Sequence, residues 1–88
     1  MRTVGNILQL DALGVGQSAR LGAMALSPAE QQRMAEMGLT AGTPVVVTKR
    51  SHLGGPLEIR IRGCKLTLRR SVARCMAVTC EPEGGGHG

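Results

Sequence analysis

The 88-residue sequence contains no phenylalanine, tyrosine or tryptophan. Proteins that bind single-stranded nucleic acids stack the bases on aromatic side chains, and grooves for proline-rich peptides are lined with aromatic rings. The composition therefore argues against both classes of binding protein. The sequence also has no apolar run near the roughly 20 residues that a membrane-spanning helix requires. We expect no membrane span.

The sequence also shows no export signal and no paired cysteines. The segment from Met1 to Asn6 lacks the apolar region of a secretory signal peptide. Three cysteines are an odd number, and Cys64, Cys75 and Cys80 form no C-x-x-C pair. Unpaired thiols without an export signal are typical of reduced, cytoplasmic proteins. We therefore expect a cytoplasmic location.

Basic residues are concentrated in the second half of the chain. Up to Pro44, three basic residues balance three acidic ones, whereas residues 45–80 hold eight basic residues and a single acidic residue, Glu58. A formal charge of +7 over this segment would attract an acidic protein surface, phosphate groups or membrane headgroups. The same side chains could also form only the solvated face of a sheet, so charge alone does not identify a partner.

Residues 27–38 carry the signals of one short helix. Ser27 and Glu30 have the spacing of a capping box, and Pro28 occupies the first helical position, where its missing N–H is tolerated. Gly38 is placed to adopt the left-handed conformation that ends many helices. The pattern predicts a helix of about three turns.

The rest of the chain predicts five short strands, within residues 19–26, 45–48, 57–62, 65–69 and 75–80. Residues 57–62 alternate strictly between apolar and charged side chains, as in a strand with one buried face. Gly63-Cys64 has the length of a tight hairpin connection, and residues 54–56 form a loop signal. Short strands, tight turns and one helix predict a mainly β fold, a small and strongly bent barrel.

One domain is expected over residues 1–80, followed by a disordered glycine-rich tail over residues 81–88, which has no apolar residue to bury. The apolar positions of the helix and strands predict a largely buried core. Its expected members are Leu21, Met34, Met37, Leu39, Val45, Val47, Leu57, Ile59, Ile61, Leu66, Leu68, Met76 and Val78.

Three segments, in order along the chain, are similar to motifs of one known family. Residues 33–42 match R-hydrophobic-x-E-hydrophobic-G-L-x-x-G, and residues 53–59 match L-G-x-P-hydrophobic-x-hydrophobic. Residues 68–78 are similar to a closing L-R-R-x-x-A-x-x-hydrophobic-x-V element. The sequence therefore resembles FeoA, the small cytoplasmic accessory protein of bacterial ferrous iron uptake.

This resemblance implies a fold, a partner and a role. The fold would be an SH3-like β-barrel of about five strands with the helix inserted after the first strand. The partner would be FeoB, a membrane transporter with a cytoplasmic GTP-binding domain, and the role would be non-catalytic regulation of that transporter. FeoA-like folds also occur as C-terminal modules of iron- or manganese-dependent transcription regulators. A small basic barrel that binds nucleic acid is therefore the alternative.

The predicted partner-binding surface combines one loop with four arginines. Its residues are His52, Leu53, Gly54, Gly55, Pro56, Arg60, Arg62, Arg69 and Arg70. An acidic surface on the cytoplasmic side of the transporter would complement it, and membrane contact would occur only through the transporter. In the alternative, the same arginines would lie along nucleic-acid phosphates. The missing aromatic residues argue against specificity for single strands, although phosphate contacts alone need none. We expect the transporter rather than nucleic acid as the partner.

The sequence predicts neither an enzyme nor a defined metal site. No G-x-x-x-x-G-K-[ST] motif is present, so we expect no direct GTP binding. We also expect no catalytic residues, because a general base needs a partner within hydrogen-bond reach and the acidic residue nearest to His52 in sequence is Glu58. The candidate metal ligands lack paired spacing: His52, Cys64, Cys75, Cys80 and His87. A strand over residues 57–62 would separate His52 from Cys64 by roughly 20 Å, whereas His52 with Cys75, or Cys64 with Cys80, stays open. We expect no required cofactor; adventitious zinc or another transition metal could bridge two molecules through His52.

Overall fold

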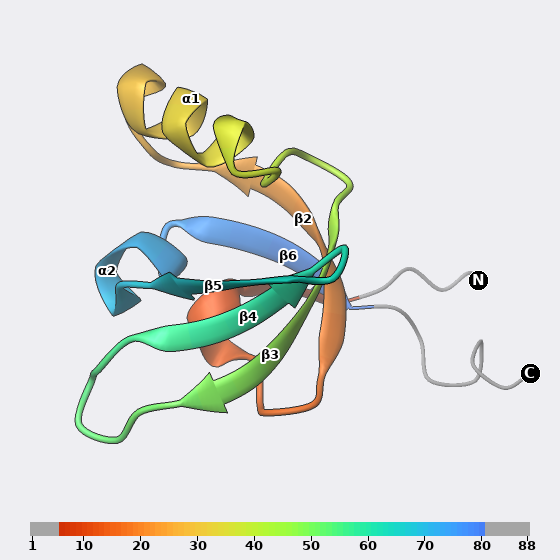
Figure 1. Ribbon diagram of the computed structural model, residues 1–88, viewed down its shortest axis with the longest axis vertical. Coiled ribbons are helices and arrows are strands. Elements are labelled where there is room, and N and C mark those ends of the chain that lie inside the picture. The colour runs from red at the N-terminus through yellow and green to blue at the C-terminus, as the bar shows by residue number, and fades with distance from the viewer. Residues whose placement is uncertain (1–5, 81–88) are drawn as a thin grey trace, which may run out of the picture.

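The computed structural model describes residues 6–80, and six strands within them form one antiparallel sheet in the order β1-β6-β2-β3-β4-β5 (Figure 1). The elements are β1 (Asn6–Gln9), the 3-10 turn η1 (Leu10–Ala12), β2 (Ser18–Met24), helix α1 (Pro28–Glu36), β3 (Pro44–Arg50), β4 (Leu57–Ile61), β5 (Cys64–Leu68), helix α2 (Arg70–Ala73) and β6 (Met76–Cys80). The predicted tail, residues 81–88, lies outside the described residues.

The sheet bends strongly, so that one face encloses the core (Figure 1). Two register shifts contribute to this bend. One lies in β2 opposite β6, between Leu21 and Met24, and the other lies in β3 opposite β4, between Val47 and Lys49. Such irregularities kink a strand and increase its twist. The result is the mainly β, SH3-like barrel that the sequence predicted, with β1 and β5 at the edges of the sheet.

The core consists of the inward-facing side chains of the sheet, together with residues from η1 and α1. Leu57, Ile59 and Ile61 are buried on β4, which confirms the strict alternation of that segment. Eleven of the thirteen predicted core residues are buried; Leu66 is only partly buried. Leu10 and Leu13, at the start and immediately after the end of η1, are fully buried and were not predicted. Their segment has no periodic pattern to indicate which side chains face inward.

Helix α1 begins and ends where the sequence predicts, but it contributes only one buried residue. The capping box of Ser27 and Glu30 is formed on both sides. Met34 is buried, whereas Met37 is the C-cap residue and is 38% exposed, so its prediction as a core residue is wrong. The chain turns at Gly38, where φ is +95° and an added Cβ would lie 3.3 Å from the Ile61 side chain. The Gly38 backbone therefore lies close to the Ile61 side chain.

Two further details differ from the sequence prediction. Strand β1 was not predicted, so α1 follows the second strand rather than the first. It escaped prediction because it is an edge strand without alternating burial: Ile7 is 74% exposed and Leu8 is 36% exposed. The β4–β5 connection is Arg62-Gly63, one residue earlier than expected, because Ile61 pairs with Cys64. The φ angles of the two turn residues are +42° and +85°, as in a type I′ turn.

Candidate partner-binding surface

The loop between β3 and β4, residues 51–56, is a compact turn. The Gly55 N–H donates to the His52 carbonyl at 3.4 Å, and the Ser51 N–H donates to the Pro56 carbonyl at 3.3 Å. The central residues of the turn, Leu53 and Gly54, both have positive φ angles, 63° and 78°. An added Cβ at Gly55 would lie 2.6 Å from the Ser51 Cβ, so the two sides of the loop are in close contact.

Helix α2 ties this loop to the rest of the barrel. The Arg70 Nη2 donates to the Ser51 carbonyl at 3.2 Å. Arg70 is half-buried, and its Nε is buried without a hydrogen-bond partner in the described residues. The neighbouring Arg69 is exposed and caps the helix through its backbone only. Of the two arginines predicted here, Arg70 positions the loop and Arg69 is accessible to a partner.

A second group of basic side chains lies on the outer face of the sheet. Register places Ser18 opposite Val46, Val46 opposite Arg60, and Arg60 opposite Lys65, so these residues form one row across four strands. Arg60 and Lys65 are both exposed. Lys65 was not among the predicted residues, although its alternation with Leu66 and Leu68 was a signal for this position.

The predicted surface is therefore divided into two parts. We call residues 51–56 with Arg69 and Arg70 the loop end, and Arg60 and Lys65 the outer-face row; Arg62 lies beyond the row, in the turn after β4. The two parts lie toward opposite ends of β4, since Leu57 pairs with Leu68 next to the loop end and Ile61 pairs with Cys64 beside the turn of Arg62. From Leu57 to Arg60, three residues of strand span about 10 Å.

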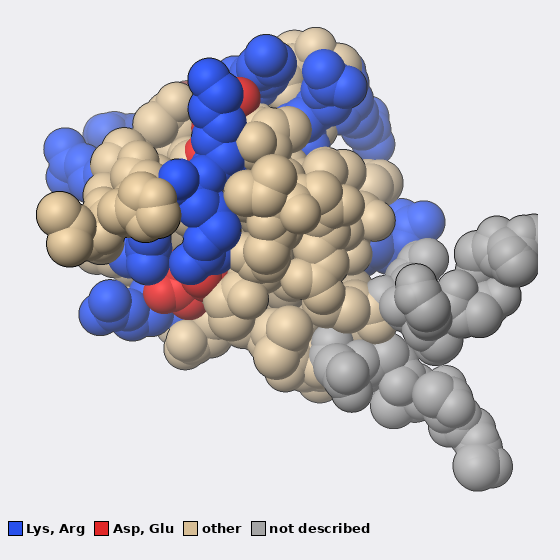
Figure 2. All heavy atoms as spheres, turned by 90° about the horizontal axis from the view of Figure 1, so that it is seen from below, with Lys and Arg blue, Asp and Glu red and all other residues tan. Residues whose placement is uncertain are grey.

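Acidic groups near these parts are already engaged. The Thr48 hydroxyl donates to the Glu58 carboxylate at 2.8 Å. The Asp11 carboxylate lies 3.7 Å from the Arg74 Nε. Arg50 is also occupied internally, because its Nη1 donates to the carbonyls of Asp11, at 2.8 Å, and of Leu13. Seen from below Figure 1, the molecule shows many more Lys and Arg atoms than Asp and Glu atoms (Figure 2). This face would attract an acidic partner.

The potential metal ligands are spread over the fold. His52 lies in the loop before β4 and Cys64 lies directly after the turn that follows β4, so β4 separates them. Cys64 is exposed, Cys75 is half-buried, and Cys80 is buried beside Gln17, whose Nε2 lies 3.8 Å from the thiol sulfur. Within residues 6–80, no three His, Cys, Asp or Glu side chains are grouped so as to hold a metal ion. The predicted ligand His87 lies outside the described residues.

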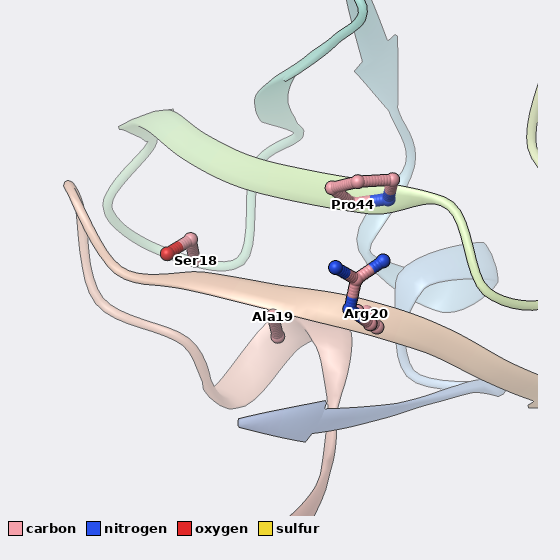
Figure 3. Close-up of a pocket in the computed structure, with 4 residues that line it drawn as sticks. All are labelled: Ser18, Ala19, Arg20 and Pro44. Carbon is pink, nitrogen blue, oxygen red and sulfur yellow. The ribbon is translucent and has the colours of Figure 1, made fainter. Parts of the chain in front are cut away.

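A small hollow lies on the surface between β2 and β3. It is lined by Ser18, Ala19, Arg20 and Pro44, and the Arg20 guanidinium points toward Pro44 across it (Figure 3). Its volume is about 90 Å³, well below the roughly 300 Å³ at which small-molecule sites begin. The Arg20 Nη1 also donates to the Gly42 carbonyl at 3.1 Å. The hollow is too small for a metabolite or nucleotide.

Neither helix in the part of the chain that the structure describes is long and apolar enough to cross a membrane.

Comparison with known proteins identifies relatives of this chain. Residues 8–80 match the family model of the FeoA domain. The solution structure of the FeoA protein from Chlorobium tepidum is 31% identical; the match covers 91% of this chain and 76% of that one, with a TM-score of 0.80. A comparison with curated protein sequences finds no significant match.

Two more distant structures share the fold. The FeoA of Stenotrophomonas maltophilia, solved with zinc and described as a prokaryotic SH3 domain protein, is 23% identical over 81% of this chain and 88% of its own, with a TM-score of 0.68. A manganese-dependent transcriptional repressor is 18% identical over 89% of this chain and 44% of its own, with a TM-score of 0.76. At these identities the likeness concerns the fold alone.

Proposed function

This chain belongs to the FeoA domain family, and from that premise we propose that it is a non-catalytic accessory protein that binds a FeoB-type transporter at its cytoplasmic side. Membership of the family supports a role in ferrous iron transport. The observation that carries the proposal is the outer-face row, because Arg60 and Lys65 are adjacent on paired strands and both are exposed. Such a row complements an acidic protein surface.

In this proposal the accessory protein binds one conformational state of the transporter more tightly than another. A partner that binds one state of a transporter more tightly than another shifts the population toward the favoured state. The chain contains no phosphate-binding loop motif, so in this proposal the nucleotide belongs to the transporter. Binding and nucleotide occupancy are then coupled, and each must change the affinity for the other by the same factor.

Nucleic acid binding is the second candidate. The fold shared with a manganese-dependent transcriptional repressor favours it, as does the row of Arg60 and Lys65, which Ser18 continues on the far side of Val46. Basic and hydroxyl side chains of this kind contact phosphates. Affinity for DNA would then fall steeply as salt rises, since each neutralised phosphate releases a counterion.

One titration distinguishes the two candidates. The full chain is titrated into the purified transporter of the same organism, with and without a GTP analogue, and into duplex DNA at the same salt concentration, by calorimetry. We expect saturable binding to the transporter that changes with the analogue, and none to DNA. Binding to DNA alone, weakening with salt, would replace the transporter proposal by the nucleic-acid one.

Charge reversal tests the surface. Replacing Arg60 and Lys65 with Glu is expected to weaken transporter binding about 10-fold or more, because like charges then face each other across the interface. The control is Arg33→Glu on exposed Arg33 of α1, which should stay within about twofold of wild type. It is matched in charge to the single variants Arg60→Glu and Lys65→Glu, which are measured beside the double variant. Equal affinities for the double variant and Arg33→Glu would exclude the outer-face row as the contact.

A further inference from the structure

Leu53 is the most exposed of the large apolar side chains in the described residues, at 103% of the reference area. It occupies the first central position of the turn in the loop end, with a φ of 63°. Asn, Asp and Gly are the residues that favour this conformation, and a leucine there is strained. Leucine is therefore unfavourable at position 53 for two reasons: its apolar side chain is exposed to solvent, and its backbone is strained.

The position of Leu53 is nevertheless well defined. The turn closes through the Gly55 N–H to the His52 carbonyl, and the base of the loop closes between Ser51 and Pro56. The Arg70 guanidinium holds the Ser51 carbonyl from outside, at 3.2 Å. A side chain on so constrained a loop loses less conformational entropy when a partner covers it.

The surroundings of Leu53 are basic. Lys49, near the end of β3, and Arg69, at the start of the segment that holds the loop, are exposed. Arg50 and Arg70 add positive charge, but both are half-buried and donate to backbone carbonyls. Two acidic side chains belong to this region: Asp11 lies beside Arg74, which offsets its charge, and Glu58 accepts from the Thr48 hydroxyl, which carries no compensating charge. Basic side chains still outnumber them. An apolar side chain projecting from a basic rim is complementary to an apolar pocket with an acidic rim.

We propose that Leu53 is the apolar anchor of this protein's partner interface, and that it inserts into an apolar pocket rimmed by Asp or Glu on the transporter. The identity of the partner rests on the proposed function; the chemistry of the pocket rests on the loop end alone. Anchors of this kind govern dissociation, whereas exposed charges mainly govern association. Changes at Leu53 should therefore alter mainly the dissociation rate, and changes in the outer-face row mainly the association rate.

The first experiment measures binding kinetics of the full chain on immobilised, purified transporter. Leu53→Gly removes the side chain and suits the positive φ, so the variant folds. It is expected to dissociate about 10- to 100-fold faster, with an association rate close to wild type. Leu53→Met, which keeps an apolar side chain, should restore most of the affinity. The matched control is Val15→Ser, since Val15 is another exposed apolar side chain, at 61%.

If the wild-type protein binds the transporter, these variants test whether Leu53 is the anchor. A Leu53→Gly variant with the wild-type dissociation rate would overturn the anchor and leave the proposed function standing. Equal losses in Leu53→Gly and Val15→Ser would overturn it as well, because binding would then depend on general surface hydrophobicity.

The second experiment covers the case in which wild type does not bind the transporter. A photoreactive diazirine amino acid is placed at position 53, or at position 15 as the control, in the full chain within cells of the source organism. Cross-linked peptides are then sequenced. Position 53 is expected to label an apolar segment flanked by Asp or Glu, at least 10-fold more strongly than position 15.

Such a peptide from the transporter supports both proposals. The same chemistry in a different protein supports the anchor and overturns the transporter as partner. A labelled segment without acidic residues, or no labelling above the control, overturns the anchor.

Discussion

The two turns that flank β4 both have two successive residues with positive φ angles, but they present different side chains. In the loop end, Leu53 and Gly54 have φ angles of 63° and 78°; after β4, Arg62 and Gly63 have φ angles of 42° and 85°. Each turn thus places a non-glycine residue in the left-handed region, followed by a glycine. One presents an apolar side chain and the other a cation. Their difference shows that the fold supplies two strained, exposed positions and leaves the chemistry to the residue at each.

The two turns also differ in their support. The loop end is held by Arg70 through the Ser51 carbonyl, whereas the second turn directly joins β4 and β5 through the pair of Ile61 and Cys64. The first is anchored by tertiary contacts and the second by its own hairpin. Substitutions in the strand between the turns, and in the turn residues themselves, test these differences.

The largest effect is expected from the strand that both turns share. Ile59 is fully buried at the middle of β4. Ile59→Ala is expected to lower the free energy of unfolding by about 2–5 kcal/mol, because it leaves a cavity in a small core. The melting temperature, followed by circular dichroism, should fall by at least about 10 °C. A melting temperature within a few degrees of wild type would contradict the inward orientation of Ile59.

A smaller effect, on binding rather than on stability, is expected from exchanging the two turn residues. The double variant Leu53→Arg with Arg62→Leu keeps composition, net charge and both positive φ angles. We expect transporter binding to weaken about 10-fold or more, with little change in the melting temperature. The single variants serve as controls, and Leu53→Arg should account for most of the loss. Wild-type affinity in the double variant would mean that the partner does not distinguish the two ends of β4.

The smallest effect is expected from relieving the backbone strain at each turn. A non-glycine residue in the left-handed region costs about 1–2 kcal/mol, and glycine loses about 0.5–1 kcal/mol more chain entropy on folding. Leu53→Gly and Arg62→Gly are therefore each expected to raise the free energy of unfolding by about 0.5–1 kcal/mol, measured by denaturant titration. Gly63→Ala is the opposite control, since its φ of 85° disfavours any Cβ, and it should destabilise. A loss of stability in Leu53→Gly would show that its side chain contributes to folding.

Local sequence signals predicted the elements whose determinants lie within a few residues. The capping box at Ser27 and Glu30 set the start of α1, and the alternation of residues 57–61 identified β4 and its buried face. Strand β1 was missed because only its pairing with β6 makes it a strand. The turn of Arg62 and Gly63 was placed one residue late, because a single glycine can occupy either central position and the register decides between them.

The sequence predicted most residues of the candidate site but not how they lie relative to one another. The sequence identified the loop of residues 51–56 and the basic residues on both sides of β4. It did not show that Arg70 is engaged with Ser51, that Lys65 stands beside Arg60, or that the predicted set separates into two parts. Whether these parts contact one partner stays a prediction.

The sequence by itself determined the fold class, the position of α1, the family and the excess of basic residues after Pro44. These depend on patterns within short segments, where hydrogen bonding and the alternation of side chains are local. Only the tertiary structure decided which arginines are accessible, that Met37 is exposed, and that Leu53 projects from a loop whose Ser51 carbonyl is held by Arg70, 19 positions further along the chain. Register and side-chain engagement depend on residues that are distant in the chain, and no local pattern specifies which of them meet.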